Sequence, residues 1–314
     1  MKELLRTNDM IRLSWLSALL KDAGIDAIVL DGHTSVVEGS VNAIQRRIMV
    51  FDDHWQEARQ VLEDADARSN DTLLGGCVRL HQPAHGYRAA IDPVLLAAAA
   101  PVRPGQSVVD LGCGPGAAAL CLLWRVADCR VTGVELQADL VALAKKNASV
   151  NGLENRFSAI HGDVAVLDRA TLGHVDHVIS NPPYLPQVLA APDKKGDVAF
   201  VETVPLAIWL GAALDAVREK GCVTVIHRAD RLNEILAALH GRAGDIAVLP
   251  LWPKAGAPAR RVIVSARRSV RNPLRLLPGL VLHRADGSYT DAAEAVLRRG
   301  KALSLDAPLN DGDE

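Results

Sequence analysis

The stretch Ser107-Val-Val-Asp-Leu-Gly-Cys-Gly-Pro-Gly116 decides how this chain folds. Its first four residues form a short apolar run that ends in an acid, and glycines follow at three alternate positions. Good helix formers then run from Ala117 to Val126. This order predicts a strand, a tight turn and a helix. The glycines permit positive φ and let the backbone approach a ligand, and the helix start presents free N–H groups to that ligand.

The loop alone fits two kinds of cofactor. Gly112, Gly114 and Ala117 satisfy the G-x-G-x-x-G/A pattern of a nicotinamide dinucleotide site. Two other features favour S-adenosylmethionine. Asp110 precedes the glycines, where a carboxylate disfavours a doubly charged pyrophosphate but can pair with a methionine ammonium. Gly116 is an additional glycine that opens room beside the helix start.

Two further strands are predicted to end in acids. Residues 130–135 end in Glu135, which can accept both ribose hydroxyls, and residues 157–163 end in Asp163, which is placed to meet an adenine amino group. A helix is expected between them, over 139–150. Because open α/β sheets bind ligands at the carboxyl ends of their strands, acids at the ends of three successive strands indicate one shared ligand.

The motif Asn181-Pro-Pro-Tyr184 follows a fourth predicted strand, residues 174–180. An aromatic amine is a poor nucleophile because its lone pair is delocalised into the ring. If the Asn181 side-chain oxygen and the Pro182 carbonyl accept the two N–H groups, that lone pair can turn towards a methyl group. Pro182 and Pro183 fix the backbone, and Tyr184 offers a ring on which a base can stack. The motif therefore indicates a clamp for a planar amine or amide, and we call residues 181–184 the amine clamp.

Together these motifs resemble the class I methyltransferases whose fourth strand ends in Asn-Pro-Pro-Tyr or Asn-Pro-Pro-Phe. Within that class the chain resembles the bacterial valine-tRNA adenine-N6 methyltransferase family, which has a segment similar to residues 86–96 before the first strand. The resemblance covers about residues 71–303. It implies a seven-stranded, mostly parallel Rossmann-like sheet with helices on both faces, S-adenosyl-L-methionine as cofactor, and the adenine 3′ of a tRNA anticodon as substrate.

The resemblance also assigns roles to individual residues. Those implied at the cofactor are Asp110, Gly112, Gly114, Gly116, Glu135, Asp163 and Asn181, and those implied at the target base are Asn181, Pro182, Pro183 and Tyr184. Tyr87 and Arg88 are expected near the mouth of the cofactor site. Asp92-Pro93 is interpreted as an ordinary helix start, with an N-cap followed by proline. Lys194-Lys195 fall after the clamp, where related enzymes vary and substrate choice is often made.

Residues 1–67 are predicted to form a separate α/β module. Strands are expected over 2–7, 25–30 and 46–51, and helices over 10–22 and 55–66. This βαββα order predicts a small sandwich with helices on one face of the sheet. It resembles a short bacterial signal-transducing domain of unknown function, and it carries no constellation of catalytic groups.

Composition indicates a globular chain of 314 residues, 49% of them hydrophobic. Charges interrupt the apolar core that a signal peptide or membrane span would need, so we expect a cytoplasmic protein. The five cysteines show no zinc spacing, which favours reduced thiols and no bound metal. Residues 304–314 are expected to be a disordered acidic tail. No pattern indicates an oligomeric state.

Charge is unevenly distributed along the chain. Residues 256–300 hold nine arginines and three acids, a net charge of +6. This excess predicts contacts with RNA phosphates, with tRNA as the expected partner. The residues expected at the RNA are Arg88, Arg260, Arg261, Arg267 and Arg268. A solvated strand edge is the alternative interpretation of each arginine, because residues 260–265 are expected to include the last strand.

The rest of the chain completes the α/β alternation. Helices are predicted over 205–218 and 231–239, and strands over 221–227, 246–249 and 260–265. Three alternatives to a tRNA adenine-N6 methyltransferase stay open. The clamp also suits a protein glutamine amide or the N2 of a ribosomal RNA guanine, and a regulatory protein would bind S-adenosylmethionine without turnover.

Overall fold

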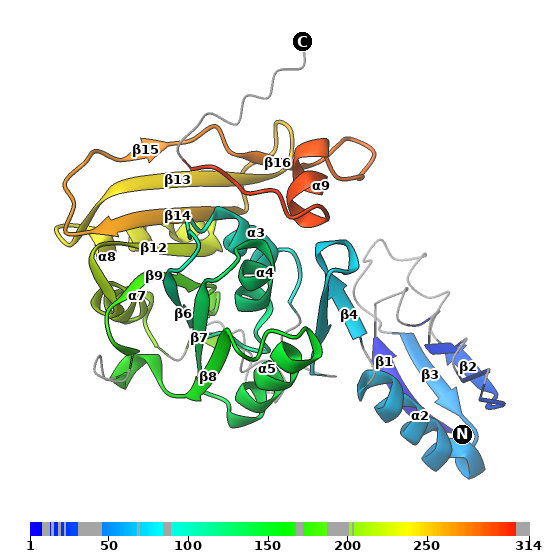
Figure 1. Ribbon diagram of the computed structural model, residues 1–314. Helices are drawn as coiled ribbons and strands as arrows, with labels where there is room; N and C mark the ends of the chain where they lie inside the picture. Colours follow the sequence, from blue (N-terminus) through cyan, green and yellow to red (C-terminus); the bar gives the residue numbers. More distant parts are fainter. Residues whose placement is uncertain are drawn as a thin grey trace. The chain divides into compact units, whose positions relative to one another are not determined.

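A computed structural model describes residues 1–7, 13, 16–17, 20–21, 23–30, 46–67, 70–83, 89–167, 172–186, 201–202 and 204–305. The chain divides into two compact units, Met1–Ser69 and Asn70–Glu314. A large sheet with helices around it forms the body of the second unit (Figure 1).

The large sheet contains the predicted strands in the predicted order along the chain. Its strands are β6 (Ser107–Leu111), β7 (Arg130–Glu135), β8 (Phe157–His161), β9 (Val175–Ser180), β12 (Val217–Arg228), β13 (Ala243–Lys254), β14 (Arg261–Arg268), β15 (Arg275–Leu276) and β16 (Leu280–His283). The helices of this unit are α3 (Asp92–Ala99), α4 (Ala117–Arg125), α5 (Ala138–Val150), α7 (Leu206–Ala216), α8 (Leu232–Leu239) and α9 (Asp291–Leu297). Short 3₁₀ turns lie at Leu74–Gly76 (η2), Val164–Val166 (η3) and Ala229–Arg231 (η5).

The strands pair in the order β8-β7-β6-β9-β12-β14-β13. The first five are parallel, and β14 is antiparallel to both its neighbours. The prediction of a seven-stranded, mostly parallel sheet is confirmed. Two short strands, β15 and β16, also pair with β13 at the edge and were not predicted. The chain runs outwards from β6 to β8 and then returns to the other side of β6, so the strand order reverses between β6 and β9.

Two hydrophobic cores cover the two faces of this sheet. Neighbouring residues of β6 divide between them, since Val108 packs with the core of α3, α4, α5 and α9, while Val109 packs with the core of α7 and α8. Successive side chains of a strand point to opposite faces, so these helices lie on opposite sides of the sheet. The predicted covering of both faces is therefore confirmed.

Asn147 of α5 and Asn151, which follows the last residue of that helix, attach a hairpin to this body. The hairpin pairs β4 (Asn70–Leu73) with β5 (Val78–His81). Asn147 accepts from the His81 N–H at 2.8 Å and donates to the His81 carbonyl at 2.9 Å, and Asn151 bonds the Arg79 N–H and carbonyl at 2.8 and 2.7 Å. Side chains four residues apart on one helix face thus satisfy alternate residues of a strand edge. Asn147 is fully buried and also donates to the Pro115 carbonyl of the glycine loop, at 2.9 Å.

The first unit contains a three-stranded antiparallel sheet in the order β1-β3-β2. Its elements are β1 (Lys2–Thr7), β2 (Ala27–Leu30), β3 (Arg46–Val50), a 3₁₀ turn η1 (Asp52–His54) and α2 (Trp55–Ala67). Leu13, Leu16 and Leu20 are helical and buried, and the remainder of the predicted helix 10–22 lies mostly outside the described residues. These leucines form one core with Ile48 and Leu62. The role of this unit stays a prediction.

The packed part of the chain extends beyond Leu303. Leu305 falls in the stretch expected to be a tail, yet it is 7% exposed and its carbonyl accepts from Arg275 at 2.8 Å. Residues 306–314 lie outside the described residues. A further two-stranded pairing joins β10 (Leu185–Pro186) to β11 (Val201–Glu202) in parallel.

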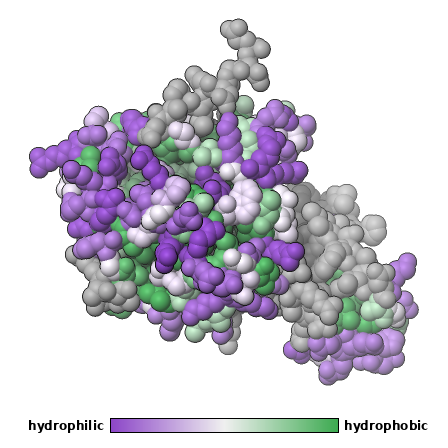
Figure 2. Space-filling model, in the orientation of Figure 1, coloured by the Kyte–Doolittle hydropathy of each residue, from purple (hydrophilic) through white to green (hydrophobic). Residues whose placement is uncertain are grey.

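Hydrophilic residues cover much of the surface shown in Figure 2, with apolar residues in small areas between them. Exposed large apolar side chains of the second unit, such as Val166 of η3, Ile208 of α7 and Leu136 after β7, come from different segments of the chain. Within the part of the chain that the structure describes, no helix has the length and apolar character to cross a membrane. The cellular compartment stays a prediction.

Replacing Asn147 by leucine should lower the free energy of unfolding by about 3 kcal/mol, because buried backbone groups of His81 and Pro115 lose their partners. Denaturant unfolding of the full chain measures this loss. Lys146→Leu is the matched control, since it makes the same substitution at the adjacent, exposed position. Equal unfolding midpoints for the two variants would contradict this account of the asparagine contacts.

Candidate active site

The glycine loop between β6 and α4 is held against the end of β7. The N–H groups of Gly112 and Cys113 donate to the Val134 carbonyl at 2.8 and 3.0 Å, and the Gly116 N–H donates to the Cys113 carbonyl at 2.9 Å. Gly112, Gly114 and Gly116 all have positive φ, of 71°, 54° and 91°. This backbone favours glycine, so the predicted strand, tight turn and helix form as the sequence pattern indicated.

Trp209 of α7 connects this loop to the strand that carries the amine clamp. A Cβ atom at Gly112 would lie 2.8 Å from Cζ2 of Trp209, so only glycine fits there. The indole Nε1 donates to Ser180 Oγ at 2.8 Å, and Ser180 Oγ donates to the Leu111 carbonyl at 2.7 Å. Leu111 and Ser180 are also register partners of β6 and β9. Gly112 and Asn181 directly follow these two residues. The glycine loop and the clamp therefore start from the ends of neighbouring strands, whose spacing is about 4.8 Å.

Asp110 is a buried carboxylate with one oxygen free for a ligand. Its side chain is 2% exposed, and Oδ2 has no hydrogen-bond partner among the described residues. Burial raises the pKa of Asp110 to about 7, the negative charge of Glu135 adds to the rise, and the Ala119 N–H at the start of α4 opposes it. A buried carboxylate that lacks a cation is costly, and an ammonium group would remove that cost. The site therefore fits the amino end of a methionine.

The other two predicted acids lie at the ends of the neighbouring strands. Glu135 ends β7, and its two oxygens accept from the N–H groups of Gly114 and Gln137 at 3.0 and 2.9 Å. Asp163 follows β8, and its Oδ1 accepts from the Ala165 N–H at 2.8 Å, which caps η3. Each carboxylate oxygen has more than one lone pair, so these contacts leave capacity for a ligand. The structure thus brings all three acids to one edge of the sheet.

The amine clamp lies at the same edge, next to the glycine loop. The Tyr184 hydroxyl contacts Oδ1 of Asn181, and it donates to Oδ2 of Asp92 at 2.8 Å. Arg261 Nε donates to the same Asp92 oxygen at 3.1 Å. Asp92 is the first residue of α3 rather than its N-cap, which is Ile91, and its side chain makes no capping bond. The interpretation of Asp92 as a helix cap was therefore wrong, because its carboxylate turns to the clamp instead.

The Tyr184 ring is enclosed more than a stacking platform requires. Tyr184 is 9% exposed, and the Arg261 guanidinium carbon lies 4.6 Å from the ring centroid. The His227 ring packs at a steep angle to it, with 5.1 Å between centroids. The face beneath Arg261 is not open to a planar base while that arginine stays in place. Base stacking on Tyr184 stays a prediction.

The described arginines that were expected at RNA lie at the two opposite ends of strand β14 or next to them. Strand β14 runs antiparallel to β12, so Arg261 pairs with Arg228 near the clamp while Arg267 pairs with Cys222 near the other edge. Seven residues of strand separate Arg261 from Arg268, a distance of roughly 23 Å.

The two far arginines bind neighbouring backbone. Arg267 donates to the Lys220 carbonyl at 3.2 Å, and Arg268 donates to the Val217 carbonyl at 2.6 Å. Arg260 is exposed on the clamp side. An extended strand carries its two ends apart, so these four arginines do not lie in one cluster, and contact of any of them with RNA stays a prediction. Tyr87, Arg88 and Lys194-Lys195 lie outside the described residues.

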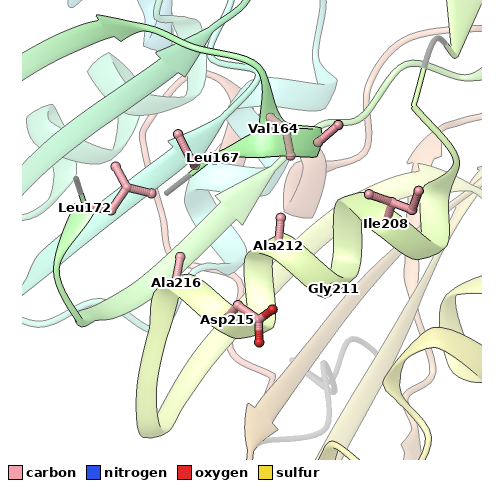
Figure 3. A pocket seen from close by; sticks show the side chains of 9 residues that line it. Val164, Leu167, Leu172, Ile208, Gly211, Ala212, Asp215 and Ala216 are labelled. Carbon is pink, nitrogen blue, oxygen red and sulfur yellow. The ribbon is translucent and has the colours of Figure 1, made fainter. Parts of the chain in front are cut away.

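A separate cavity of about 300 Å³ lies between η3 and α7. Figure 3 shows its apolar lining, with Val164 and Leu167 facing Ala212 and Ile208 of the helix. Of the described residues that line it, only Asp215 is charged, and Asp215 pairs with Arg242 at 2.5 Å. The lining contains no residue of the glycine loop or the clamp, so the chemistry concentrates at the strand ends rather than in this cavity.

The sequence motifs missed three residues that shape the site. Ser180 and Trp209 connect the loop to the clamp, and Asp92 binds the clamp tyrosine. Ser180 is the last residue of an apolar strand, and its position directly before Asn181 was the only local signal. Trp209 and Asp92 act across long sequence separations, which no local pattern reveals.

Comparison with known proteins identifies the two parts of the chain. Residues 90–195 match the family model "Methyltransferase small domain", and residues 1–66 match the model "Putative prokaryotic signal transducing protein". The solved structure of a predicted O-methyltransferase from Agrobacterium tumefaciens has a TM-score of 0.59 and 24% identity, and the alignment covers 69% of this chain and 100% of that one. This likeness shows a shared methyltransferase fold.

Curated relatives define the family more closely. A tRNA1(Val) (adenine(37)-N6)-methyltransferase of Serratia proteamaculans is 30% identical over 209 residues, which are 65% of this chain and 79% of the relative. The protein of the same name from Actinobacillus pleuropneumoniae serotype 7 is 29% identical over 205 residues, 64% of this chain and 84% of the relative. With its glycine loop, strand-end acids and amine clamp at one sheet edge, the chain belongs to the tRNA1(Val) (adenine(37)-N6)-methyltransferase family.

Proposed function

We propose that this protein methylates the exocyclic N6 of an adenine in tRNA, the adenine at position 37 of a valine tRNA as in the names of its relatives. The protein is an N-methyltransferase whose cofactor is S-adenosyl-L-methionine. The cofactor supplies a methyl group on a positively charged sulfur that leaves readily. The residues of the chain need only bind and orient the two reactants, which accounts for most of the catalytic effect in such a transfer.

The observation that carries this proposal is the register of β6 and β9. Because Leu111 and Ser180 are paired, the glycine loop and the amine clamp begin side by side at the point where the strand order reverses. Ligands of open α/β sheets bind in this crevice. A cofactor on the loop and an amine on the clamp would therefore meet without a large movement of either element.

The cofactor would be held by the three strand-end acids. Asp110 Oδ2, buried and without a protein partner among the described residues, would receive the methionine ammonium. Glu135 would accept the ribose hydroxyls, and Asp163 would accept the adenine amino group. The loop glycines let the backbone approach the methionine moiety, since side chains there would fill that space or strain the positive φ.

The acceptor amine would be held by Asn181 and Pro182. Two accepting oxygens bind both N–H bonds of a planar amino group and turn its lone pair out of the ring plane, towards the methyl group. Pro182 is buried and rigid, so its carbonyl is fixed in position. Since this arrangement orients the nitrogen rather than removing a proton before attack, no general base is required among these residues.

Wild-type protein incubated with labelled S-adenosylmethionine and, in parallel, total tRNA, ribosomal RNA and soluble protein should label tRNA as N6-methyladenosine by nucleoside mass spectrometry. Asn181→Ala should reduce the rate at least about 100-fold, because the amine loses an orienting acceptor, while calorimetric affinity for S-adenosylhomocysteine is retained. If the label appeared in ribosomal RNA or protein instead, that molecule and not tRNA would be the substrate. Full turnover by Asn181→Ala would remove the role of the clamp.

The affinity for S-adenosylhomocysteine should depend on pH through Asp110. The pKa of Asp110 is raised to about 7 without ligand, and a bound ammonium lowers it, so binding releases a proton. Affinity should therefore rise about 10-fold per pH unit below about pH 7 and fall again above about pH 8, where the amino group of the free ligand loses its proton. Calorimetry from about pH 5.5 to 8.5 measures the slope.

Asp110→Asn should flatten this profile and weaken binding at high pH. Asp139→Asn is the control, because Asp139 is an exposed acid in the first turn of α5 and should leave the slope unchanged. A wild-type slope in Asp110→Asn would rule out Asp110 as the partner of the ammonium.

A further inference from the structure

The sheet edge that carries the glycine loop and the clamp differs in charge from one end to the other. Asp110, Glu135 and Asp163 lie at or just after the ends of β6, β7 and β8. On the other side of the clamp, β13 ends at Lys254 and β14 begins at Arg261. Because β14 is antiparallel to both β12 and β13, the turn between β13 and β14 reaches the same edge as the clamp.

This turn, residues 254–260, carries cations and no acids, and we call it the basic turn. It belongs to residues 246–285, which contain eight lysines and arginines and no aspartate or glutamate. Lys254 and Arg260 are exposed, and neither forms an ion pair within the described part of the chain. Lys254 Nζ donates to the Ala285 carbonyl at 3.2 Å, so the ammonium is held at the edge with two of its three donors left for a ligand.

Arginines of the same stretch that lie towards the opposite edge have acidic partners. Arg267 Nη1 lies 3.8 Å from Asp245 Oδ2, and Arg275 Nη2 lies 3.4 Å from Asp245 Oδ1. Arg268 Nε lies 3.5 Å from Glu219 Oε1. These positive charges are compensated within the protein, whereas the two cations of the basic turn keep theirs for a partner.

Acids close to the basic turn are engaged with other residues. Asp286 directly follows Ala285, and its Oδ1 accepts from the N–H and the hydroxyl of Ser288 at 2.9 and 2.7 Å. Asp230 follows β12, and its Oδ1 accepts from Arg228 Nε at 3.0 Å. Neither carboxylate pairs with Lys254 or Arg260, so the surface of the turn stays positive.

The basic turn lies within reach of a nucleic-acid strand whose target base is in the clamp. Strands β9, β12, β14 and β13 are successive neighbours, so Arg260 and Lys254 lie roughly 10 and 14 Å along the edge from the clamp. Enzymes that act on a base turn it out of its stack and contact the nucleotides beside it. The acids at the cofactor end would repel phosphates, so the strand would extend from the clamp over the basic turn.

We propose that Lys254 and Arg260 form a phosphate-binding surface, which holds the RNA backbone beside the target adenine. This inference rests on the proposed tRNA substrate and names the part of the protein that grips it. It includes one of the arginines expected at RNA and adds a lysine that was not expected there. Phosphate contacts fix the position of the strand without reading its sequence, so the surface places the adenine while the clamp selects the amine.

The test measures binding of an unmodified transcript of the valine tRNA to the full chain at a series of salt concentrations. The double variant Lys254→Gln/Arg260→Gln should lower the slope of log affinity against log salt by about 1.4, about 0.7 for each lost contact to a single strand. Affinity at about 0.1 M salt should fall about 25-fold, and the difference should vanish near 1 M. In methyl transfer, KM for tRNA should rise while kcat stays unchanged.

The matched control is Lys220→Gln/Arg271→Gln, which removes one lysine and one arginine at the opposite edge. Both residues are exposed, and neither has an ion pair among the residues described. The control should keep the wild-type slope. Equal losses in the two double variants would show an effect of net charge alone and would overturn the proposed surface.

A charge-preserving exchange and a fold control complete the test. Lys254→Arg/Arg260→Lys should keep the wild-type slope, and a reduced slope there would also contradict the proposal. Affinity for S-adenosylhomocysteine and thermal unfolding should match the wild type in every variant. Since binding is measured without methyl transfer, a tRNA that binds with the expected slopes but is not methylated contradicts the proposed function alone. Methylated tRNA with an unchanged slope in Lys254→Gln/Arg260→Gln contradicts the surface alone.

Discussion

The parallel pairing of β6 with β9 is the constraint on which this site depends. Ser180 Oγ donates to the Leu111 carbonyl and receives Trp209 Nε1, so one hydroxyl fixes two strand ends and a covering helix together. The indole in turn fills the space that any side chain at Gly112 would need. The loop that would hold the cofactor and the clamp that would hold the amine are thereby positioned by the same few atoms, and the strand reversal at this point leaves their ends open to ligands.

Two carboxylates at this edge have opposite surroundings and therefore different uses. Asp110 is buried without a cation, its pKa is raised to about 7, and its Oδ2 has no partner among the described residues, so it gains most from a positively charged ligand. Asp92 instead accepts hydrogen bonds from Arg261 and the Tyr184 hydroxyl, so its carboxylate holds protein side chains in place. Burial without a partner creates a binding site, whereas burial with one creates a rigid support.

Local patterns predicted the strands, the helices and the edge at which they end. The apolar run before Asp110, the alternate glycines and the acid at Glu135 all act over a few residues, so their consequences can be inferred from spacing. The contacts that complete the site could not be inferred in this way. Arg261 reaches Asp92 across 169 residues and Tyr184 reaches it across 92. The sequence also did not settle where the arginines of residues 256–300 lie. Their number does not reveal that Arg261 and Arg267 stand at opposite ends of β14.

A crystal structure of the protein with bound S-adenosylhomocysteine would test the central claim most directly. The account predicts the cofactor amino nitrogen within about 3 Å of Asp110 Oδ2 and the sulfur facing Asn181 across the β6–β9 crevice. A cofactor bound away from Asp110, or with its sulfur turned away from the clamp, would contradict the claim that the paired ends of β6 and β9 build one active site.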